Sequence, residues 1–443
     1  MTSYPLTDMI RKSKSRVFKS LSRFIGRDEI RDLFTGPKNR ERIYHAWPLF
    51  QMWLHQTLSG CSCREAIAWA IGNGVIPSRV SPLTPAFCNA KKKFGEVPLK
   101  SLMSSVGWTI EESSDGRRRP FGRNVLVADG TSVQLPDTPS NQREYPQPKG
   151  QKAGCGQPVM GIVALMGLGS GAIVDLAAGM GSGFELPLFR KLWSSLKKGD
   201  LLLADAEFCA YAHLACLIGK GVDFLVRKRN DDLQNYAKRE IGKDDYLLVL
   251  KRGSEPNWIE REQLPESMLV RAIAFSFQTP DGDIREKVII TSLLDPKLYP
   301  KEKVIEIYRR RWEMEIVFNH IKTQMGMSLL KSKSPEGCLR EFLVGMIAYN
   351  VIRGIMLDAA CKAHVPPCRI SFQGTVSRVR NLSPLITALD PQRAYTLLMN
   401  HIAKDIVPER PGRSEPRMRK RRPKNYPLLT KYRNSFNHAP CKS

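Results

Sequence analysis

Short apolar runs alternate with helix-like segments in the middle of the chain, between residues 124 and 227. The strand-like runs are Asn124–Gly130, Val159–Leu168, Ala172–Ala178, Gly199–Asp205 and Val222–Arg227. The helix-like segments among them are Leu186–Leu196 and Ala210–Gly221. The second and third strand-like runs are joined by Gly-Ser-Gly and predict a buried hairpin. Alternation of strands and helices is typical of α/β proteins, so we predict an α/β sheet here.

Different patterns flank this region. Residues 1–115 are mostly helix-like, and a linker pattern at Ser113–Pro120 separates them from the α/β region. Residues 228–294 contain strand-like runs separated by turn residues, which predicts a β-rich insertion. Strong helical patterns follow at Lys301–Met325 and Leu339–Leu357. The domains we predict are 1–115, 120–227 together with 295–360, 228–294, and 361–443.

The charge of the chain points to a polyanionic partner. There are 69 Lys and Arg residues against 43 Asp and Glu, a formal net charge of +26. Nucleic acid is the first candidate for a chain of this charge. Residues 410–433 hold ten basic residues and one acidic residue, together with four prolines, and predict an extended basic tail. Lys91, Lys92 and Lys93 form a second basic cluster, for which DNA phosphate contacts and a solvated lysine face are equally good readings.

The same composition weighs against several other classes. The ten cysteines include no CxxC pair, so a zinc ribbon or zinc finger is not expected, and reduced cytosolic thiols are the simplest reading. The N-terminus has no apolar segment of the kind that signal peptides carry. No stretch reaches about 18 uninterrupted apolar residues, so we predict no membrane association and a cytoplasmic protein.

Two aspartates follow directly on short apolar runs. Asp129 and Asp205 each close a strand-like run, and the carboxyl ends of strands are where open α/β sheets build their sites. A solvent-facing loop aspartate is the ordinary reading of either residue alone. Two in one sheet favour a Mg²⁺ site, because Mg²⁺ takes one or two carboxylates plus substrate phosphate.

The helix-like segment from Lys301 carries a second set of candidates on one face. At about 100° per residue, Tyr308, Arg311, Glu315 and Lys322 fall within an arc of about 60°. Glu313 falls on the far side. An ordinary stripe of ion pairs is the simpler reading of the helix alone. Three carboxylates on a compact core in so basic a chain nevertheless favour two-metal phosphoryl transfer on nucleic acid.

Three blocks of residues together match a known family. The first is Asp129-Gly130-Thr131 followed by Leu135–Pro139, and the second is Gly199–Asp205 followed by Phe208 and Tyr211. The third, Tyr308-x₂-Arg311-x₃-Glu315-x₆-Lys322, is the most specific. These blocks resemble DDE transposases of the insertion-sequence-four family, whose signature is Y-R-E-K at this spacing. Segments 81–93 and 417–430 also resemble parts of that family.

The resemblance implies an RNase H-like catalytic core with a β-rich insertion, a helical N-terminal DNA-binding domain and a basic C-terminal tail. It implies that Asp129, Asp205 and Glu315 are the catalytic residues and bind the metal. Mg²⁺ is the expected ion, and Mn²⁺ also fits an oxygen site.

The resemblance also assigns DNA contacts. Tyr308, Arg311 and Lys322 would hold phosphates of the transposon end. Many members carry Arg directly after the second Asp, whereas this chain has Ala206, which leaves the local support of Asp205 open. Trp258 lies in the insertion, where some relatives stack a flipped base on a tryptophan. We favour the alternative, a packed tryptophan.

The function that follows is that of a cut-and-paste transposase acting on double-stranded DNA. It would cleave at the ends of its element, join the exposed 3′-OH to target DNA, and form a homodimer at least on DNA, in a bacterial cytoplasm. Two alternatives stay open: a metal-dependent nuclease without strand transfer, and an inactive DNA-binding derivative.

Overall fold

The computed structural model describes most of the predicted catalytic region. The described residues are 25, 27–34, 43–114, 119–181, 183, 185–229, 233, 236, 238–253, 256–278, 284–381 and 391–408. The predicted basic tail 410–433 lies outside them.

Among the described residues, nine strands form one sheet. They are β1 Val125–Gln134, β2 Val159–Gly167, β3 Ile173–Met180, β4 Leu201–Ala204, β5 Asp223–Arg227, β6 Lys238–Gly242, β7 Asp245–Lys251, β8 Ser267–Gln278 and β9 Ile284–Thr291. Their order in the sheet is β3-β2-β1-β4-β5-β9-β8-β7-β6. β1 pairs in parallel with β4, and β4 with β5, whereas every other pair is antiparallel. This is a mixed α/β sheet, as the alternating pattern predicted.

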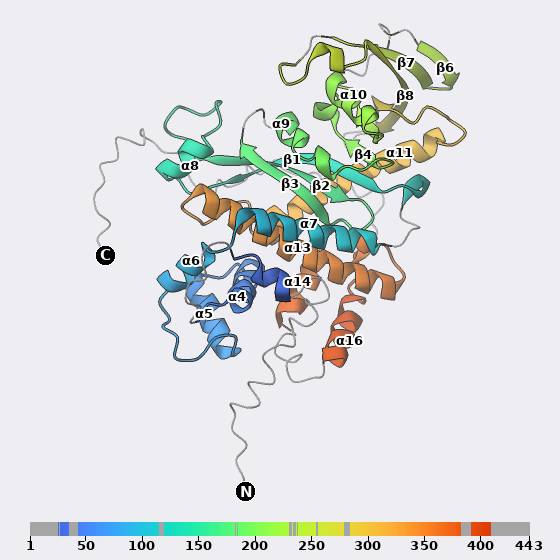
Figure 1. The fold of residues 1–443 in the computed structure, drawn as a ribbon. Coiled ribbons are helices and arrows are strands. Elements are labelled where there is room, and N and C mark those ends of the chain that lie inside the picture. Colours follow the sequence, from blue (N-terminus) through green and yellow to red (C-terminus); the bar gives the residue numbers. More distant parts are fainter. Residues whose placement is uncertain are drawn as a thin grey trace.

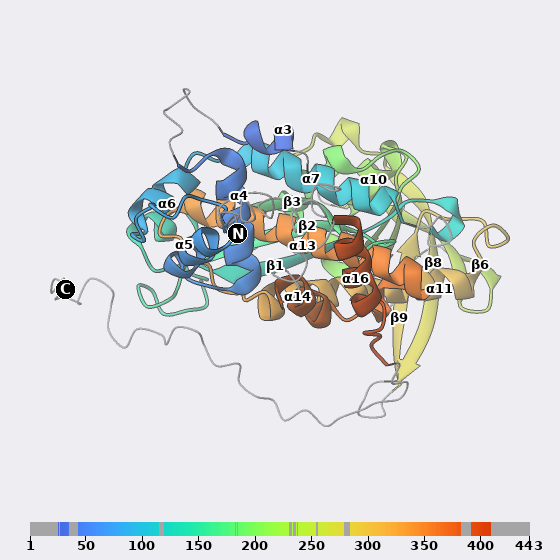
Figure 2. The same ribbon diagram turned by 90° about the horizontal axis from the view of Figure 1, so that it is seen from below.

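Helices cover both faces of the central strands (Figure 1). The α-helices of the described residues are α3 Arg27–Arg31, α4 Ala46–Ser59, α5 Cys63–Gly72, α6 Pro85–Lys91, α7 Glu96–Glu112, α8 Pro139–Glu144, α9 Glu185–Arg190, α10 Tyr211–Gly219, α11 Lys301–Arg309, α12 Glu313–Asn319, α13 Pro335–Ala363, α14 Phe372–Asn381 and α16 Pro391–Ile402. Figure 1 shows α9 on one side of the central strands and α13, α14 and α16 on the other, and Figure 2 shows the molecule from below, from the side of this second group.

The sheet separates two hydrophobic clusters, which explains why its central strands are apolar throughout. Successive residues of a strand point to opposite faces. In β1, Val125 and Val127 belong to the cluster that contains α7 and α13, and Leu126 and Ala128 belong to the cluster that contains α9 and α10. Strands buried on both faces read as continuous apolar runs, as seen here.

The long helix α13 runs across one of these faces. Its Asn350 accepts a hydrogen bond from the Ile173 N–H at 2.8 Å and donates one to the Ile173 carbonyl at 2.8 Å. One side chain thereby satisfies both backbone groups of an edge-strand residue, which would otherwise be open to pairing with another chain. By length and composition α13 is the one helix among the described residues that could cross a membrane, but 94% of its most apolar part is buried inside the protein.

The strands of the predicted insertion extend the central sheet. β9 pairs with β5, with Leu225 opposite Thr291, and β8, β7 and β6 follow outward. A buried ion pair holds this part together: the Arg271 guanidinium contacts the Asp245 carboxylate through two nitrogens, at 2.8 and 2.5 Å. Arg271 also donates to the Tyr299 carbonyl at 2.7 Å, so it links the inserted strands to the segment before α11.

The segment predicted as one helix from Lys301 to Met325 is helical from Lys301 to Gln324, but its hydrogen bonding changes twice. A 3₁₀ turn, Arg310–Trp312, separates α11 from α12, and a π-helical turn, His320–Gln324, follows α12. The 3₁₀ turn winds more tightly than an α-helix and the π turn less tightly. Side chains along the path therefore keep nearly the α-helical phase from its start to its end.

Candidate active site

The parallel pairing of β1 and β4 brings the first two predicted carboxylates level with each other. Val127 pairs with Leu203, and Asp129 and Asp205 each lie two residues further along their strands. β4 ends one residue before Asp205, and one Asp205 carboxylate oxygen then accepts a hydrogen bond from the Glu207 N–H at 2.9 Å. Asp205 thus follows a buried strand, as predicted.

Asp129 does not end its strand, contrary to prediction. β1 continues to Gln134, because β2 goes on pairing with it, with Asp129 opposite Ala164 and Gln134 opposite Val159. The first four residues of β1 are buried, and most of those from Asp129 onward are only partly covered. The apolar run therefore ends where full burial of the strand ends and not where the strand itself stops.

The helical path from α11 to α12 presents its predicted face to these strands. The Tyr308 hydroxyl donates to the Ala204 carbonyl at 3.4 Å. One Arg311 nitrogen lies 3.5 Å from an Asp129 carboxylate oxygen, and another lies 3.8 Å from a Glu315 oxygen. Arg311 thus bridges the first and third predicted carboxylates.

The rest of the path confirms the two faces. The Lys322 ammonium donates to the Thr131 hydroxyl at 3.2 Å, on the strand that carries Asp129. Glu313, predicted for the far side, pairs with Arg310 at 2.7 Å. His320 stacks on a ring of α14, with 4.3 Å between the ring centroids. One face therefore meets β1 and β4, and the other packs against the C-terminal helices.

Burial and mutual repulsion perturb the titration of this group. The pKa of Asp129 is raised to about 6. Burial is the largest cause, and the charges of Asp205 and Glu315 act in the same direction, while Arg311 opposes them. Burial also raises the pKa of Tyr308 to about 12. Tyr308 therefore remains a neutral hydroxyl near pH 7, and Asp129 is a carboxylate that lacks enough positive charge around it.

A further carboxylate, missed by sequence reasoning, approaches β1 from the α9 face and feels the charges of this group. Glu185 begins α9, and a Cβ placed on Gly130 would lie 2.5 Å from one of its carboxylate oxygens. Burial, followed by the charges of Asp205, Asp129 and Glu207, raises the pKa of Glu185 to about 7. No motif or periodicity marks Glu185, because the contact joins segments distant in the chain.

The donor chemistry of the group fits a hard divalent cation, because carboxylate oxygens are the ligands that Mg²⁺ and Mn²⁺ prefer. Asp129, Asp205 and Glu315 would hold the ion. In the parts of the chain that the structure describes, no three carboxylate, imidazole or thiol groups converge closely enough to ligate one ion. Arg311 instead spans Asp129 and Glu315 and neutralises part of their charge.

Comparison with known proteins agrees with this geometry. The family model described as "Transposase DDE domain" matches residues 120–351, which include all four carboxylates and the bridging arginine. The chain belongs to the DDE transposase family. It is thus an enzyme that cleaves DNA and transfers strands, and DDE transposases generally use divalent metal ions.

Two individual proteins are similar to this transposase. The transposase InsG of insertion sequence element IS4 from Escherichia coli (strain K12) is 26% identical over 322 residues, 70% of each chain. The predicted insertion-sequence-four type is thereby confirmed. A solved piggyBac transposase synaptic complex with hairpin DNA aligns with a TM-score of 0.45 and 9% identity, covering 92% of this chain and 84% of that one.

Trp258, the candidate for base stacking, packs in an aromatic cluster of the transposase. The ring centroid of Trp258 lies 5.7 Å from that of Trp193 and 4.9 Å from that of His213. The Arg190 guanidinium lies over the same indole, 4.5 Å from its centroid. These contacts favour the packed alternative. A stacking role for Trp258 stays a prediction.

The three lysines of the N-terminal cluster differ in their surroundings. The Lys91 ammonium lies over the Trp53 and Phe87 rings, 5.1 and 4.8 Å from their centroids, and donates to Gln56 at 3.2 Å. Lys92 is exposed and Lys93 is half-buried. Lys91 is thus part of the packing of α4 and α6, and Lys92 has the exposed ammonium that a phosphate contact needs.

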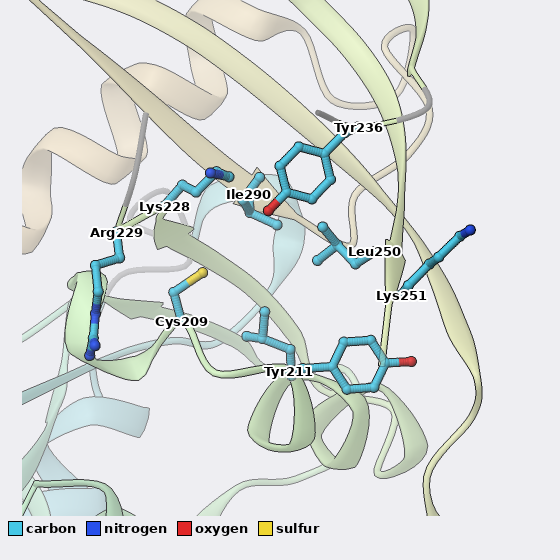
Figure 3. A pocket seen from close by; sticks show the side chains of 9 residues that line it. Cys209, Tyr211, Lys228, Arg229, Tyr236, Leu250, Lys251 and Ile290 are labelled. Atoms are coloured by element: carbon cyan, nitrogen blue, oxygen red, sulfur yellow. The ribbon is translucent and has the colours of Figure 1, made fainter. Parts of the chain in front are cut away.

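A pocket of about 280 Å³ adjoins the segment that carries Asp205 (Figure 3). Its lining combines two tyrosines and three cations with apolar side chains: Cys209, Tyr211, Leu214, Lys228, Arg229, Tyr236, Leu250, Lys251 and Ile290. Arg229 pairs with Glu207 at 2.9 Å. The pocket therefore lies between α10, the inserted strands and the turn that follows Asp205.

Proposed function

We propose that the transposase binds the terminal inverted repeats of its insertion sequence and moves that element by cut-and-paste transposition. The observation that carries the proposal is the Arg311 bridge between Asp129 and Glu315, since it joins the strand and the helix of the predicted triad. We further propose that β1 to β5 form an RNase H-like core. The cofactor would be Mg²⁺, with Mn²⁺ able to replace it.

Each residue has a distinct task in this proposal. Asp129, Asp205 and Glu315 hold the cation, which supplies charge stabilisation and a more acidic water or 3′-hydroxyl when bound. In each step an oxygen nucleophile forms a new bond to phosphorus while the bond from phosphorus to the leaving oxygen breaks. Water attacks first and leaves a 3′-OH on the element, and that 3′-OH then attacks target DNA. No covalent enzyme–DNA intermediate forms.

The cations beside the carboxylates would position the DNA. Arg311 is 10% exposed and already lies against two carboxylates, so it would contact a phosphate close to the cut. Lys322, whose ammonium lies beside the Thr131 hydroxyl, would bind the next phosphate along the DNA backbone. The Tyr308 hydroxyl would stay neutral and offer a hydrogen bond. Arg229 and Lys251, the two exposed cations that line the pocket, would extend the basic surface toward the insertion.

The remaining features concern binding rather than chemistry. We propose that the N-terminal helices and residues 410–433 bind double-stranded DNA, consistent with the net charge of +26. Two element ends must be brought together before joining, so the active species would be a homodimer on DNA. The transposase would act in the bacterial cytoplasm.

A strand-transfer assay with pre-cut element ends tests the function. Wild-type protein should join the free 3′-OH ends to target DNA in Mg²⁺. Asp129→Asn, Asp205→Asn and Glu315→Gln should each abolish cleavage and keep end binding. Glu313→Gln is the matched control, because Glu313 lies on the far face of the same helix and pairs with Arg310; it should leave cleavage intact.

Two outcomes would replace this proposal. Cleavage of ends without any joining would favour a metal-dependent nuclease. End binding by a wild-type protein that neither cuts nor joins would favour an inactive, transposase-derived DNA-binding protein.

A further inference from the structure

Three donor groups converge on one cysteine sulfur in the N-terminal helical part of the transposase. The Gln56 side-chain amide donates to the Cys63 Sγ at 3.2 Å, and the Lys91 ammonium donates to the same atom at 3.7 Å. The Cys88 thiol is the third donor, with 3.7 Å between the two sulfurs. The donors belong to α4 and α6 and the accepting sulfur to the first residue of α5, so the packing of three helices assembles the group.

These surroundings favour negative charge on the Cys63 sulfur. Cys63 is the first residue of a helix of 10 residues, and the helix dipole is positive at that end. The Lys91 ammonium adds a full positive charge, and its hydrogen bond to Gln56 at 3.2 Å holds it in place. The nearest carboxylate in the sequence, Glu65, is exposed and accepts the Ser62 N–H at 2.6 Å. The thiolate is the reactive form of cysteine, and positive groups of this kind select which cysteine reacts.

Cys88 is placed to complete a disulfide with Cys63. Their sulfurs are already in van der Waals contact, and a bond of about 2.05 Å needs only a further approach of the side chains. Both thiols are free and partly exposed, so small oxidants and reductants can reach them. Burial is the largest cause that raises the pKa of the Cys88 thiol, and the charge of Cys63 acts in the same direction. Cys88 therefore keeps its proton while Cys63 reacts.

A metal site is the other use of two neighbouring cysteines, and the surroundings do not complete one. In the described parts of the chain, no third cysteine, histidine or carboxylate joins the two sulfurs to make a group that could hold an ion. Structural zinc sites need four such ligands. The charged group beside the Cys63 sulfur is instead the Lys91 ammonium, which would repel a metal cation. Oxidation of the thiols fits this cluster better.

We propose that Cys63 and Cys88 are a redox modification site, at which a peroxide converts the two thiols into a reversible disulfide. The Cys63 thiolate attacks a peroxide oxygen: a sulfur–oxygen bond forms, the oxygen–oxygen bond breaks and hydroxide leaves, which gives a sulfenic acid. The Cys88 sulfur then attacks the Cys63 sulfur. A sulfur–sulfur bond forms, and the sulfenic hydroxyl leaves as water with the Cys88 proton. The cysteines lose two electrons in all and the peroxide gains them, and a thiol reductant reverses the change by exchange.

The pair lies outside the residues 120–351 that match the transposase domain, so it is independent of the proposed catalytic site. The disulfide would tie α5 covalently to α6, and α6 ends at Lys91, next to the exposed Lys92. In a reducing cytoplasm the pair would stay open until an oxidant reaches it, because disulfides there are usually transient.

Peroxide titration of the full-length transposase tests the modification site. Thiols that remain after limiting hydrogen peroxide are alkylated, and the digested protein is analysed by mass spectrometry. Peptides joined through Cys63 and Cys88, lighter by two hydrogen atoms, should form first, and dithiothreitol should separate them. Oxidation of Cys361 and Cys368 should be about tenfold slower, although these thiols are exposed and access alone would favour them. Faster oxidation of those two thiols, or a different partner for Cys63, would overturn the proposal.

Serine variants separate the roles of the two sulfurs. In Cys88→Ser, Cys63 should stop at the sulfenic acid, which dimedone labels, and no disulfide should form. In Cys63→Ser, Cys88 should stay unlabelled at the same peroxide dose. Cys61→Ser is the matched control, because Cys61 is also a partly exposed thiol beside the start of α5, and this variant should form the disulfide at the wild-type rate. Labelling of Cys88 in Cys63→Ser, or loss of the disulfide in Cys61→Ser, would refute the assignment.

Variants at position 91 test the activation of Cys63. Lys91→Met keeps an apolar stem beside the Trp53 and Phe87 rings and removes the ammonium, so it should slow disulfide formation by about tenfold. Lys91→Arg should restore most of the rate, because it restores the charge. Lys92→Met is the matched control: it removes an exposed charge from the next residue and should change the rate by less than about twofold. A wild-type rate in Lys91→Met would contradict the proposed activation.

Discussion

Replacing Asp129 by Asn should abolish cleavage and yet stabilise the metal-free transposase. The asparagine side-chain oxygen can still accept the Gly130 N–H, which the aspartate accepts at 2.8 Å. Arg311 keeps its contact with Glu315. The substitution removes a negative charge that is unfavourable there, because the Asp129 side chain is only 15% exposed to solvent.

The size of the effect follows from the pKa. Burial, with the charges of Asp205 and Glu315, raises the pKa of Asp129 from 3.8 to about 6. About two pKa units correspond to about 3 kcal/mol. Because the folded state holds the proton more tightly, stability falls as pH rises between the unfolded and folded pKa values, and the full deficit is present above pH 6. The variant should therefore gain about 3 kcal/mol at pH 8 and about half of that at pH 5.

Urea unfolding with a metal chelator, at pH 5 and pH 8, measures this gain as the difference in unfolding free energy between variant and wild type. Added Mg²⁺ should stabilise the wild type and leave the variant unchanged, because binding to the folded state alone raises stability. A variant that is no more stable than the wild type at pH 8 without metal would show that the Asp129 charge is well compensated. The site would then hold enough positive charge to balance its carboxylates.

Three further predictions concern the surroundings of the site. Arg271→Met should lower the unfolding free energy by about 3–5 kcal/mol, because it leaves Asp245 buried without a cation. A second substitution, Asp245→Leu, should restore part of that loss; urea unfolding measures both effects. Lys322→Ala should weaken end binding and reduce its salt slope by about one, and an unchanged slope in binding titrations would argue against a phosphate contact. Trp258→Phe should leave the pattern of cleavage products on a sequencing gel unchanged, because the indole packs against other rings. Altered products would support a base-stacking role for Trp258.

The face of the catalytic helix was predictable because helical geometry is local. Tyr308, Arg311, Glu315 and Lys322 share an arc by their spacing alone. In the structure Tyr308, Arg311 and Lys322 contact β1, β4 or their ends, and Glu315 contacts Arg311. The 3₁₀ and π turns were not visible in the sequence, but their opposite winding kept the arc intact.

The strand ends were predictable only in part. Asp205 follows its apolar run and its strand together. Asp129 follows only the apolar run, because pairing with β2 carries β1 five residues beyond it, to Gln134. Apolar patterning reports which residues are covered, whereas strand length depends on a neighbouring strand that local sequence does not describe.

The sequence by itself determined the alternation of strands and helices, the excess of positive charge, and the three carboxylates with their spacing, because each depends on residue type or on local periodicity. Only the tertiary structure decided what surrounds those carboxylates. The parallel register sets Asp129 level with Asp205, Arg311 reaches across to bridge the strand and the helix, and Gly130 admits Glu185 from α9. These relations join residues far apart in the chain, so the packing of the whole sheet and its helices fixes them.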